Sequence, residues 1–256
     1  MTLHVTDYGG AGRPPLVVMH GLLGSARNWA GTGKRLAEHY HVLALDLPNH
    51  GASPALDPAD YPSMVRALLA TLDGLGLERV TLMGHSLGGK VAMCAACWHP
   101  SRVERLLVLD IAPRQYVPDY RSFDAMQAVD LGRVSQRTDA ETQMSEFGLS
   151  DSHRLFLLTN LVRTDEGTYR WAVDLELLRR QLPLFTAPPL RPQDRYEGPT
   201  RFIVGGGSRY WTEGDLEIAL RHFPRADVVV LPDSGHNVHI EGGAQFLSAV
   251  QSSESP

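Results

Sequence analysis

A serine between two glycines marks the stretch of this sequence that is best suited to chemistry. Ser86 lies in Gly84-His85-Ser86-Leu87-Gly88, after the apolar run 80–83 and before a segment of helical composition. A Gly-x-Ser-x-Gly segment in that setting is typical of a nucleophile elbow, a strained turn that presents the serine hydroxyl. Side chains at positions 84 and 88 would collide in such a turn. We therefore interpret Ser86 as a nucleophile; the strand and helix beside it disfavour a chance match.

The overall composition excludes several classes of function. The chain has 256 residues, a net charge of −5 and no lysine- or arginine-rich run, which argues against nucleic acid or an anionic membrane surface as the main partner. No apolar run approaches the length of a membrane span, so no stable membrane association is expected. The first residues lack a basic segment followed by an apolar stretch, so we see no secretory signal and expect a cytoplasmic protein. The oligomeric state is not predicted.

The elements around Ser86 alternate between buried strands and helices. Continuous apolar runs predict strands buried on both faces, and amphipathic spacing predicts helices between them. Strands are expected at 3–8, 16–19, 41–45, 80–83, 103–109, 200–205 and 228–231. Helices are expected at 25–40, 61–75, after the elbow, at 213–222 and at 244–250. This alternation predicts an α/β fold with a mostly parallel sheet and helices on both of its faces.

The alternation stops between residues 112 and 196. This stretch has no strong strand pattern, and helical pieces are expected at 122–129, 140–147, 152–162 and 175–184. We interpret residues 112–196 as a helical cap insertion over the carboxyl edge of the sheet, where such folds bind ligands. Residues 1–111 and 197–251 then form the core, and the tail 252–256 is expected to be disordered.

The two cysteines are spaced as Cys-x-x-Cys, at Cys94 and Cys97. A metal or redox site would need turn residues around them, and a zinc site would need a second ligand pair. They lie instead in a segment of helical composition, so we expect thiols that pack this helix on the sheet. No metal and no cofactor is implied.

Several motifs together resemble the α/β-hydrolase superfamily, and within it the YbfF-type esterases and their eukaryotic mitochondrial relatives. The motifs are His20-Gly21-Leu22-Leu23-Gly24, Asp46-Leu47-Pro48-Asn49-His50-Gly51-Ala52-Ser53-Pro54, Gly84-His85-Ser86-Leu87-Gly88-Gly89-Lys90, Asp110-Ile111-Ala112-Pro113, Leu158-Thr159-Asn160-Leu161-Val162 and Gly235-His236. The similarity spans nearly the whole chain. It implies the α/β-hydrolase fold with a cap, and esterase activity without fixing the substrate.

A serine nucleophile needs a neutral imidazole to accept its proton. The order in α/β-hydrolases is Ser, then Asp or Glu, then His, which leaves His153, His222, His236 and His239 as candidates. His236 follows the last predicted strand in a flexible turn, at the same sheet edge as Ser86. We therefore predict His236 as the base.

The acid is harder to place. Many α/β-hydrolases carry it after the strand predicted here at 200–205, but this sequence has Ser208 at that position. Asp110 ends the preceding strand on the same edge and in the required order, so we predict Asp110 as the acid. Its alternative role is a turn or helix cap. Other candidates for the acid are Asp174, Glu176 and Asp215, or a site without a third member.

Acyl transfer also needs donors for the oxyanion. We expect them to be the backbone N–H groups of Leu87 and of Leu22, with Leu23 as the alternative to Leu22. For His20 and His50 we expect a bracing role in these loops. Leucines near the donors suggest an apolar acyl group, and Leu23, Tyr210 and Trp211 are weaker candidates for lining the pocket.

These features predict a cofactor-free serine carboxylesterase that acts on small-molecule esters. A thioesterase or a C–C bond hydrolase would use the same groups, and the sequence does not separate them. A dehalogenase or epoxide hydrolase needs a carboxylate nucleophile, which the serine at position 86 excludes. A non-catalytic binding module is the hypothesis from another class, and its only support is the missing carboxylate at Ser208.

Overall fold

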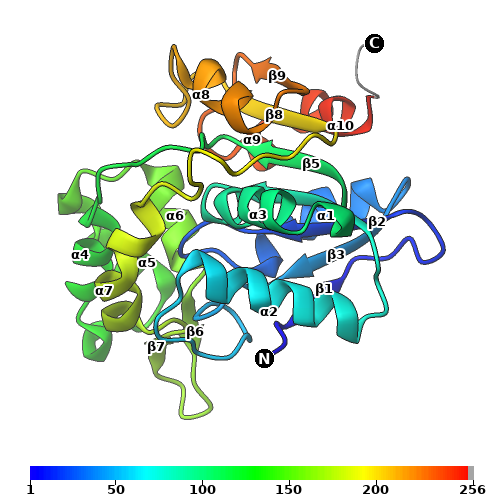
Figure 1. Cartoon of the computed structure of the whole chain (residues 1–256). Coiled ribbons are helices and arrows are strands. Elements are labelled where there is room, and N and C mark those ends of the chain that lie inside the picture. The colour runs from blue at the N-terminus through cyan, green and yellow to red at the C-terminus, as the bar shows by residue number, and fades with distance from the viewer. Residues whose placement is uncertain (253–256) are drawn as a thin grey trace.

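Seven strands form the central sheet of the protein. The computed structural model describes residues 1–252, and its sheet has the order β1-β3-β2-β4-β5-β8-β9 (Figure 1). The first strand pairs antiparallel with β3, and all the other neighbours are parallel. The bounds are β1 Val5–Asp7, β2 Pro15–Met19, β3 His41–Leu45, β4 Val80–His85, β5 Val103–Leu109, β8 Thr200–Gly205 and β9 Ala226–Leu231. The predicted α/β class and mostly parallel sheet are confirmed.

Helices cover both faces of the sheet, as predicted. Alternate residues of a strand point to opposite faces, so Val17 and Met19 of β2 pack in one core cluster and Leu16 and Val18 in another. The first cluster includes residues of α2 (Tyr61–Gly74), α3 (Leu87–Trp98) and α8 (Asp215–His222). The second includes residues of α1 (Ala30–Leu36), α9 (Val238–Glu241) and α10 (Gly243–Gln251).

The first helix of the core is shorter and less regular than predicted. The helix predicted at 25–40 begins as the 3-10 turn η1 (Ala26–Trp29) and ends as α1 at Leu36. A second short 3-10 turn, η2 (Pro100–Arg102), leads into β5.

Of the tail predicted to be disordered, 252–256, only Ser252 is described, and its N–H bonds to the carbonyl of Ser248. The other four residues lie outside the described part of the chain.

The segment between β5 and β8 forms a separate group of helices beside the sheet (left in Figure 1). Its elements are α4 (Arg121–Gln127), η3 (Leu131–Arg133), α5 (Arg137–Gln143), η4 (Ser145–Phe147), α6 (Asp151–Leu158), β6 (Leu161–Arg163), β7 (Tyr169–Trp171) and α7 (Leu175–Thr186). We refer to residues 112–196 as the helical insertion. Within residues 1–252, no helix combines the length and the apolar character needed to cross a membrane.

The predicted carboxyl end of one helix in the insertion is wrong. The pattern predicted helix over 152–162, but α6 ends at Leu158 and residues 161–163 pair with 169–171 in an antiparallel hairpin. Gly167, with φ of 85°, lies in the connecting turn, where a residue without a side chain adopts the left-handed conformation easily. Each strand has only three residues, too few for a strand pattern to be visible in the sequence.

Candidate active site

Ser86 occupies a strained turn between β4 and α3. Its φ of 51° and ψ of −114° lie outside the ordinary regions for a residue with a side chain. A Cβ added to Gly84 would lie 2.2 Å from the carbonyl oxygen of Gly88, and one added to Gly88 would lie 2.6 Å from the carbonyl oxygen of His20. The steric need for glycine at these positions is confirmed, and the turn has the form of a nucleophile elbow.

Asp110 and His236 meet at the carboxyl edge of the sheet. Asp110 follows β5 and is fully buried, and His236 lies in the loop after β9 with 27% of its side chain exposed. Nδ1 of His236 donates to Oδ2 of Asp110 over 2.7 Å, while Oδ1 accepts from the N–H of Gly205 at 2.9 Å. Because Nδ1 carries the proton, Nε2 of His236 is left as an acceptor. His236 and Ser86 line the same cavity.

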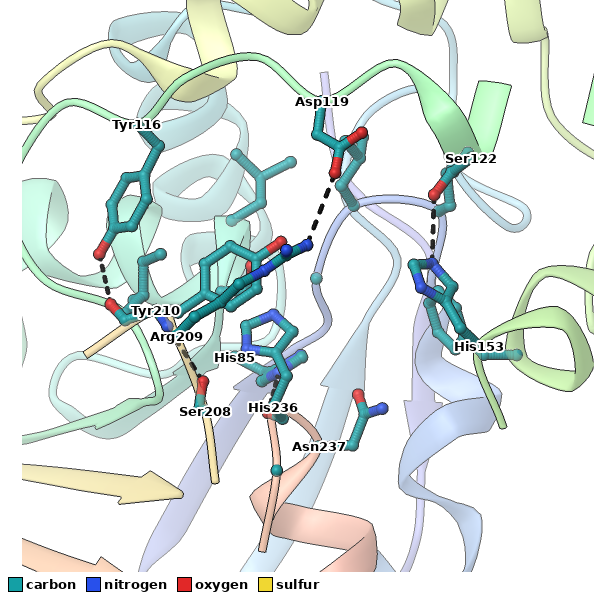
Figure 2. Close-up of a pocket in the computed structure, with 18 of the residues that line it drawn as sticks. His85, Tyr116, Asp119, Ser122, His153, Ser208, Arg209, Tyr210, His236 and Asn237 are labelled. Carbon is teal, nitrogen blue, oxygen red and sulfur yellow. Dashed lines mark hydrogen bonds and ion pairs between the residues drawn. The ribbon is translucent and has the colours of Figure 1, made fainter. Parts of the chain in front are cut away.

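Ser208 supports the same carboxylate. Its hydroxyl donates to Oδ2 of Asp110 and accepts from the N–H of Tyr210 at 3.1 Å. The ring of Tyr210 stacks on the imidazole of His236, with centroids 4.0 Å apart and planes 25° apart (Figure 2). Sequence reasoning noted that Ser208 lacks a charge but missed this contact. The adjacency of β5 and β8 was the signal, since it brings the two strand ends together.

The carboxylates considered as alternatives to Asp110 have other partners. Asp174 accepts from a backbone N–H at the start of α7, and Glu176 accepts from the side-chain amide of Gln127. Asp215 forms an ion pair with Arg114 at 2.7 Å. The structure therefore brings Asp110, and none of these three, to the imidazole of His236.

Two further buried histidines lie behind His236. The ring centroid of His85 is 4.5 Å from that of His236 and 4.7 Å from that of His239. Nε2 of His85 donates to the carbonyl of His236 over 2.9 Å, which helps to fix the loop that carries the imidazole. Burial lowers the pKa of His239 to about 3 and holds the pKa of His85 well below its usual range. Both rings are therefore neutral near pH 7.

The loop 20–24, here called the oxyanion loop, lies directly against Ser86. A Cβ added to Gly21 would be 3.2 Å from the Cβ of Ser86. The N–H of Leu23 is already bonded to Nε2 of His50 at 3.0 Å. Among residues 1–252, no hydrogen bond uses the N–H of Leu22 or of Leu87. These two N–H groups are therefore available to a ligand, and that of Leu23 is not.

His20 and His50 brace the loops as predicted. Nδ1 of His50 donates to the carbonyl of Pro48 at 2.8 Å, so its Nε2 accepts from Leu23. His20 repeats this arrangement, with Nδ1 on the carbonyl of Gly21 and Nε2 accepting from the N–H of Leu47 at 2.9 Å. Burial lowers the pKa of His20 to about 4 and that of His50 to about 3, so both remain neutral acceptors near pH 7.

A cavity of about 590 Å³ extends from Ser86 to the helical insertion. Its apolar lining includes Leu23, Ile111, Phe123, Phe156, Leu182 and Phe185. Its polar lining includes Asp119, Ser122, His153, Arg209, Tyr210 and Asn237, most of which are seen in Figure 2. Leu23 and Tyr210, the residues predicted to line a substrate pocket, border this cavity, whereas sequence reasoning did not single out Asp119 and Arg209.

The expectation for Trp211 is not met. Its ring packs against that of Phe202, with centroids 4.9 Å apart, and it borders a separate shallow depression rather than the cavity of Ser86. The cause is local, because the chain bends at residues 209–211 and the two neighbouring rings take different directions. Tyr210 faces the imidazole and Trp211 faces the β8 strand.

The cysteines belong to α3, as predicted from the composition of that segment. Both are free thiols, and Sγ of the buried Cys94 lies 3.2 Å from the carbonyl of Pro189. Burial raises the pKa of Cys97 to about 12, so its thiol is protonated at neutral pH. In the part of the chain that the structure describes, no three His, Cys, Asp or Glu residues gather as a metal-ligand set.

Comparisons with known proteins agree with this geometry. The sequence profile described as the alpha/beta hydrolase fold matches residues 14–243. The chain is 38% identical over 247 residues to the sn-1-specific diacylglycerol lipase ABHD11 of Xenopus laevis, covering 93% of this chain and 78% of the relative. It is 30% identical to esterase YbfF of Escherichia coli over 239 residues, covering 93% and 91% of the two chains.

Among solved structures, one described as a marine microorganism esterase superposes with a TM-score of 0.92. It is 29% identical in sequence, and the match covers 98% of this chain and 99% of that one. The resemblance inferred from the motifs is thus confirmed by sequence and by fold. The chain belongs to the α/β-hydrolase family, as an esterase-type member of it.

Proposed function

We propose that the protein is a cofactor-free serine carboxylesterase that cleaves small esters with an apolar acyl group. The observation that carries the proposal is the bond between His236 and the buried Asp110, in a cavity that Ser86 also lines. A nucleophile at a strained elbow, an imidazole with a free Nε2 and a carboxylate on Nδ1 are the parts that acyl transfer requires. The contact of Asp110 with His236 also argues against a non-catalytic binding module, whose only support is the missing carboxylate at Ser208.

In the proposed reaction, Nε2 of His236 takes the proton of Ser86 as Oγ attacks the ester carbonyl. The N–H groups of Leu22 and Leu87 donate to the oxyanion of the tetrahedral intermediate. Asp110 stabilises the imidazolium, which then protonates the leaving alkoxide. Water, deprotonated by His236, attacks the acyl-enzyme on Ser86 and releases the carboxylic acid.

The cavity supports an apolar acyl group on the side of the helical insertion. Phe123, Phe156, Leu182 and Phe185 come from the insertion and form much of this lining. We propose that residues 112–196 act as a cap domain over the core formed by 1–111 and 197–251. The names of the relatives, an esterase and a diacylglycerol lipase, are consistent with ester substrates.

The proposal is tested with a fluorophosphonate probe and with p-nitrophenyl acetate, comparing the wild-type protein with Ser86→Ala. We expect covalent labelling and turnover in the wild type and neither in the variant. An absence of labelling together with turnover no higher than that of the variant would exclude the proposal. A series of aryl esters of increasing acyl length then measures the reach of the apolar lining.

A further inference from the structure

Leu23 is held at both of its backbone groups by side chains from distant parts of the chain. Its N–H donates to Nε2 of His50 at 3.0 Å, and its carbonyl accepts from Nδ2 of Asn160 at 2.7 Å. Leu23 is 2% exposed and has φ of 60°, a left-handed conformation that residues with branched side chains rarely adopt. Such a conformation persists only when the surroundings impose it.

Asn160 makes the contact from the helical insertion. It lies after α6, 137 positions from Leu23, and is 5% exposed. Its backbone carbonyl accepts from the N–H of Ala172 at 2.7 Å, and its side-chain Nδ2 also lies 3.3 Å from the carbonyl of Leu157. The hairpin therefore holds the backbone of Asn160, and α6 holds its side-chain amide, so both parts of the residue are fixed within the insertion.

We propose that Asn160 is a positioning residue for the oxyanion hole, through which the insertion fixes the direction of the Leu22 N–H. This inference rests on the proposed function. The carbonyl of Leu22 and the N–H of Leu23 share one peptide plane, which His50 holds, and Asn160 holds the next plane. The N–H of Leu22 shares its peptide plane with the carbonyl of Gly21, and that carbonyl accepts from the N–H of Gly24 at 3.0 Å. This bond links the plane that Asn160 holds to the plane that carries the N–H of Leu22.

Loss of the Asn160 contact should affect the transition state more than the binding of substrate. An oxyanion donor contributes when charge develops on the carbonyl oxygen, and contributes little to the binding of the uncharged ester. Loss of the Asn160 amide leaves the N–H of Leu22 present but poorly aimed. The rate of acylation and the affinity for tetrahedral analogues should fall together, while KM changes little.

The test compares Asn160→Ala and Asn160→Ser with Tyr61→Phe. The Tyr61 hydroxyl also makes a buried hydrogen bond between core and insertion, to the carbonyl of Phe185 at 2.7 Å, and Tyr61 itself does not line the cavity of Ser86. The measurements are kcat and KM for p-nitrophenyl acetate, the inhibition constant of phenylboronic acid, which forms a tetrahedral adduct with a serine, and the melting temperature.

For both Asn160 variants we expect kcat to fall by about tenfold with KM within about twofold, because one donor is misaligned rather than removed. The inhibition constant of the boronic acid should rise by the same factor. Tyr61→Phe should lower the melting temperature and leave both constants unchanged. Wild-type kcat and boronate affinity in a folded Asn160 variant would overturn the inference alone. Absence of Ser86-dependent hydrolysis in the wild type would instead overturn the proposed function.

Discussion

Ser208 and His236 donate to the same oxygen atom of Asp110. Ser208 stands where many α/β-hydrolases have their acid, and the carboxylate that it contacts comes from the neighbouring strand. Since both donors reach one oxygen, the hydroxyl and Nδ1 lie within two hydrogen-bond lengths, about 6 Å at most. The two possible positions of the acid therefore converge on one point beside the imidazole.

Loss of the Ser208 hydroxyl should lower the turnover rate of the enzyme. In Ser208→Ala, Asp110 keeps the donors from Gly205 and His236 but loses the donor at position 208. A carboxylate held by fewer donors orients the imidazole less firmly, so kcat for p-nitrophenyl acetate should fall by about threefold to tenfold. Ser208→Thr keeps a hydroxyl and should restore the wild-type kcat. Wild-type kcat in the folded alanine variant would mean that the contact is only structural.

Convergence of the two positions also predicts that the acid can be exchanged between them. Asp110→Asn should lower kcat by about 10⁴-fold, because an amide neither stabilises the imidazolium nor selects its tautomer. In that background, Ser208→Asp returns a carboxylate to the same neighbourhood and should recover at least about tenfold in kcat.

The matched control for this exchange is Ser208→Asn in the Asp110→Asn background, which adds the same volume without charge and should recover nothing. The measurement is kcat for p-nitrophenyl acetate in folded protein, checked by circular dichroism. Near-wild-type kcat in Asp110→Asn alone would show that our assignment of the acid is wrong.

Much of this arrangement could be predicted from the sequence because parallel strands end at one sheet edge. Ser86, Asp110 and His236 each follow an apolar run, so their meeting at that edge depends only on strand order. Asn160 and Ser208 could not be assigned their contacts in this way. Their partners lie 137 and 98 positions away, and no local pattern records such a contact.

The predictions for Trp211 and for the helix over 152–162 are wrong for a similar physical reason. Tyr210 and Trp211 are adjacent aromatic residues in one loop, and only its tertiary path decides which one faces the cavity. The β6–β7 hairpin has three-residue strands that are stabilised by their pairing rather than by a visible alternation. Short elements of this kind depend on contacts rather than on propensity.

Lys90 links the core to the helical insertion and should matter for stability. Its side chain is 2% exposed, and Nζ donates to the carbonyl of Ala187 at 2.9 Å, with those of Phe185 and Thr186 at 3.3 and 3.4 Å. Lys90→Met leaves these carbonyls at the end of α7 without their donor, so the free energy of unfolding should fall by about 3 kcal/mol. Urea denaturation measures it, with exposed Lys34→Met as the control. Equal stability of the two variants would contradict this role.

Acid should unfold the protein through its buried neutral histidines. Burial lowers the pKa of His20 to about 4 and the pKa values of His50 and His239 to about 3, against about 6.5 in an unfolded chain. Below pH 6.5 the unfolded chain therefore binds protons that the folded protein excludes, so the free energy of unfolding falls with pH. At pH 5 the loss is about 2 kcal/mol for each histidine, or about 6 kcal/mol for the three, a large part of the stability of an ordinary domain.

Urea titrations at pH 7.5 and pH 5 measure this loss, and a variant can assign part of it. His50→Gln keeps an acceptor for the N–H of Leu23 but cannot be protonated. Its loss of stability between the two pH values should be smaller than that of the wild type by about 2 kcal/mol. His39→Gln alters an exposed side chain and should behave like the wild type. If wild-type stability is the same at both pH values, the three imidazoles must accept protons in the folded state, and the bond from Leu23 to a neutral His50 cannot be what holds the oxyanion loop.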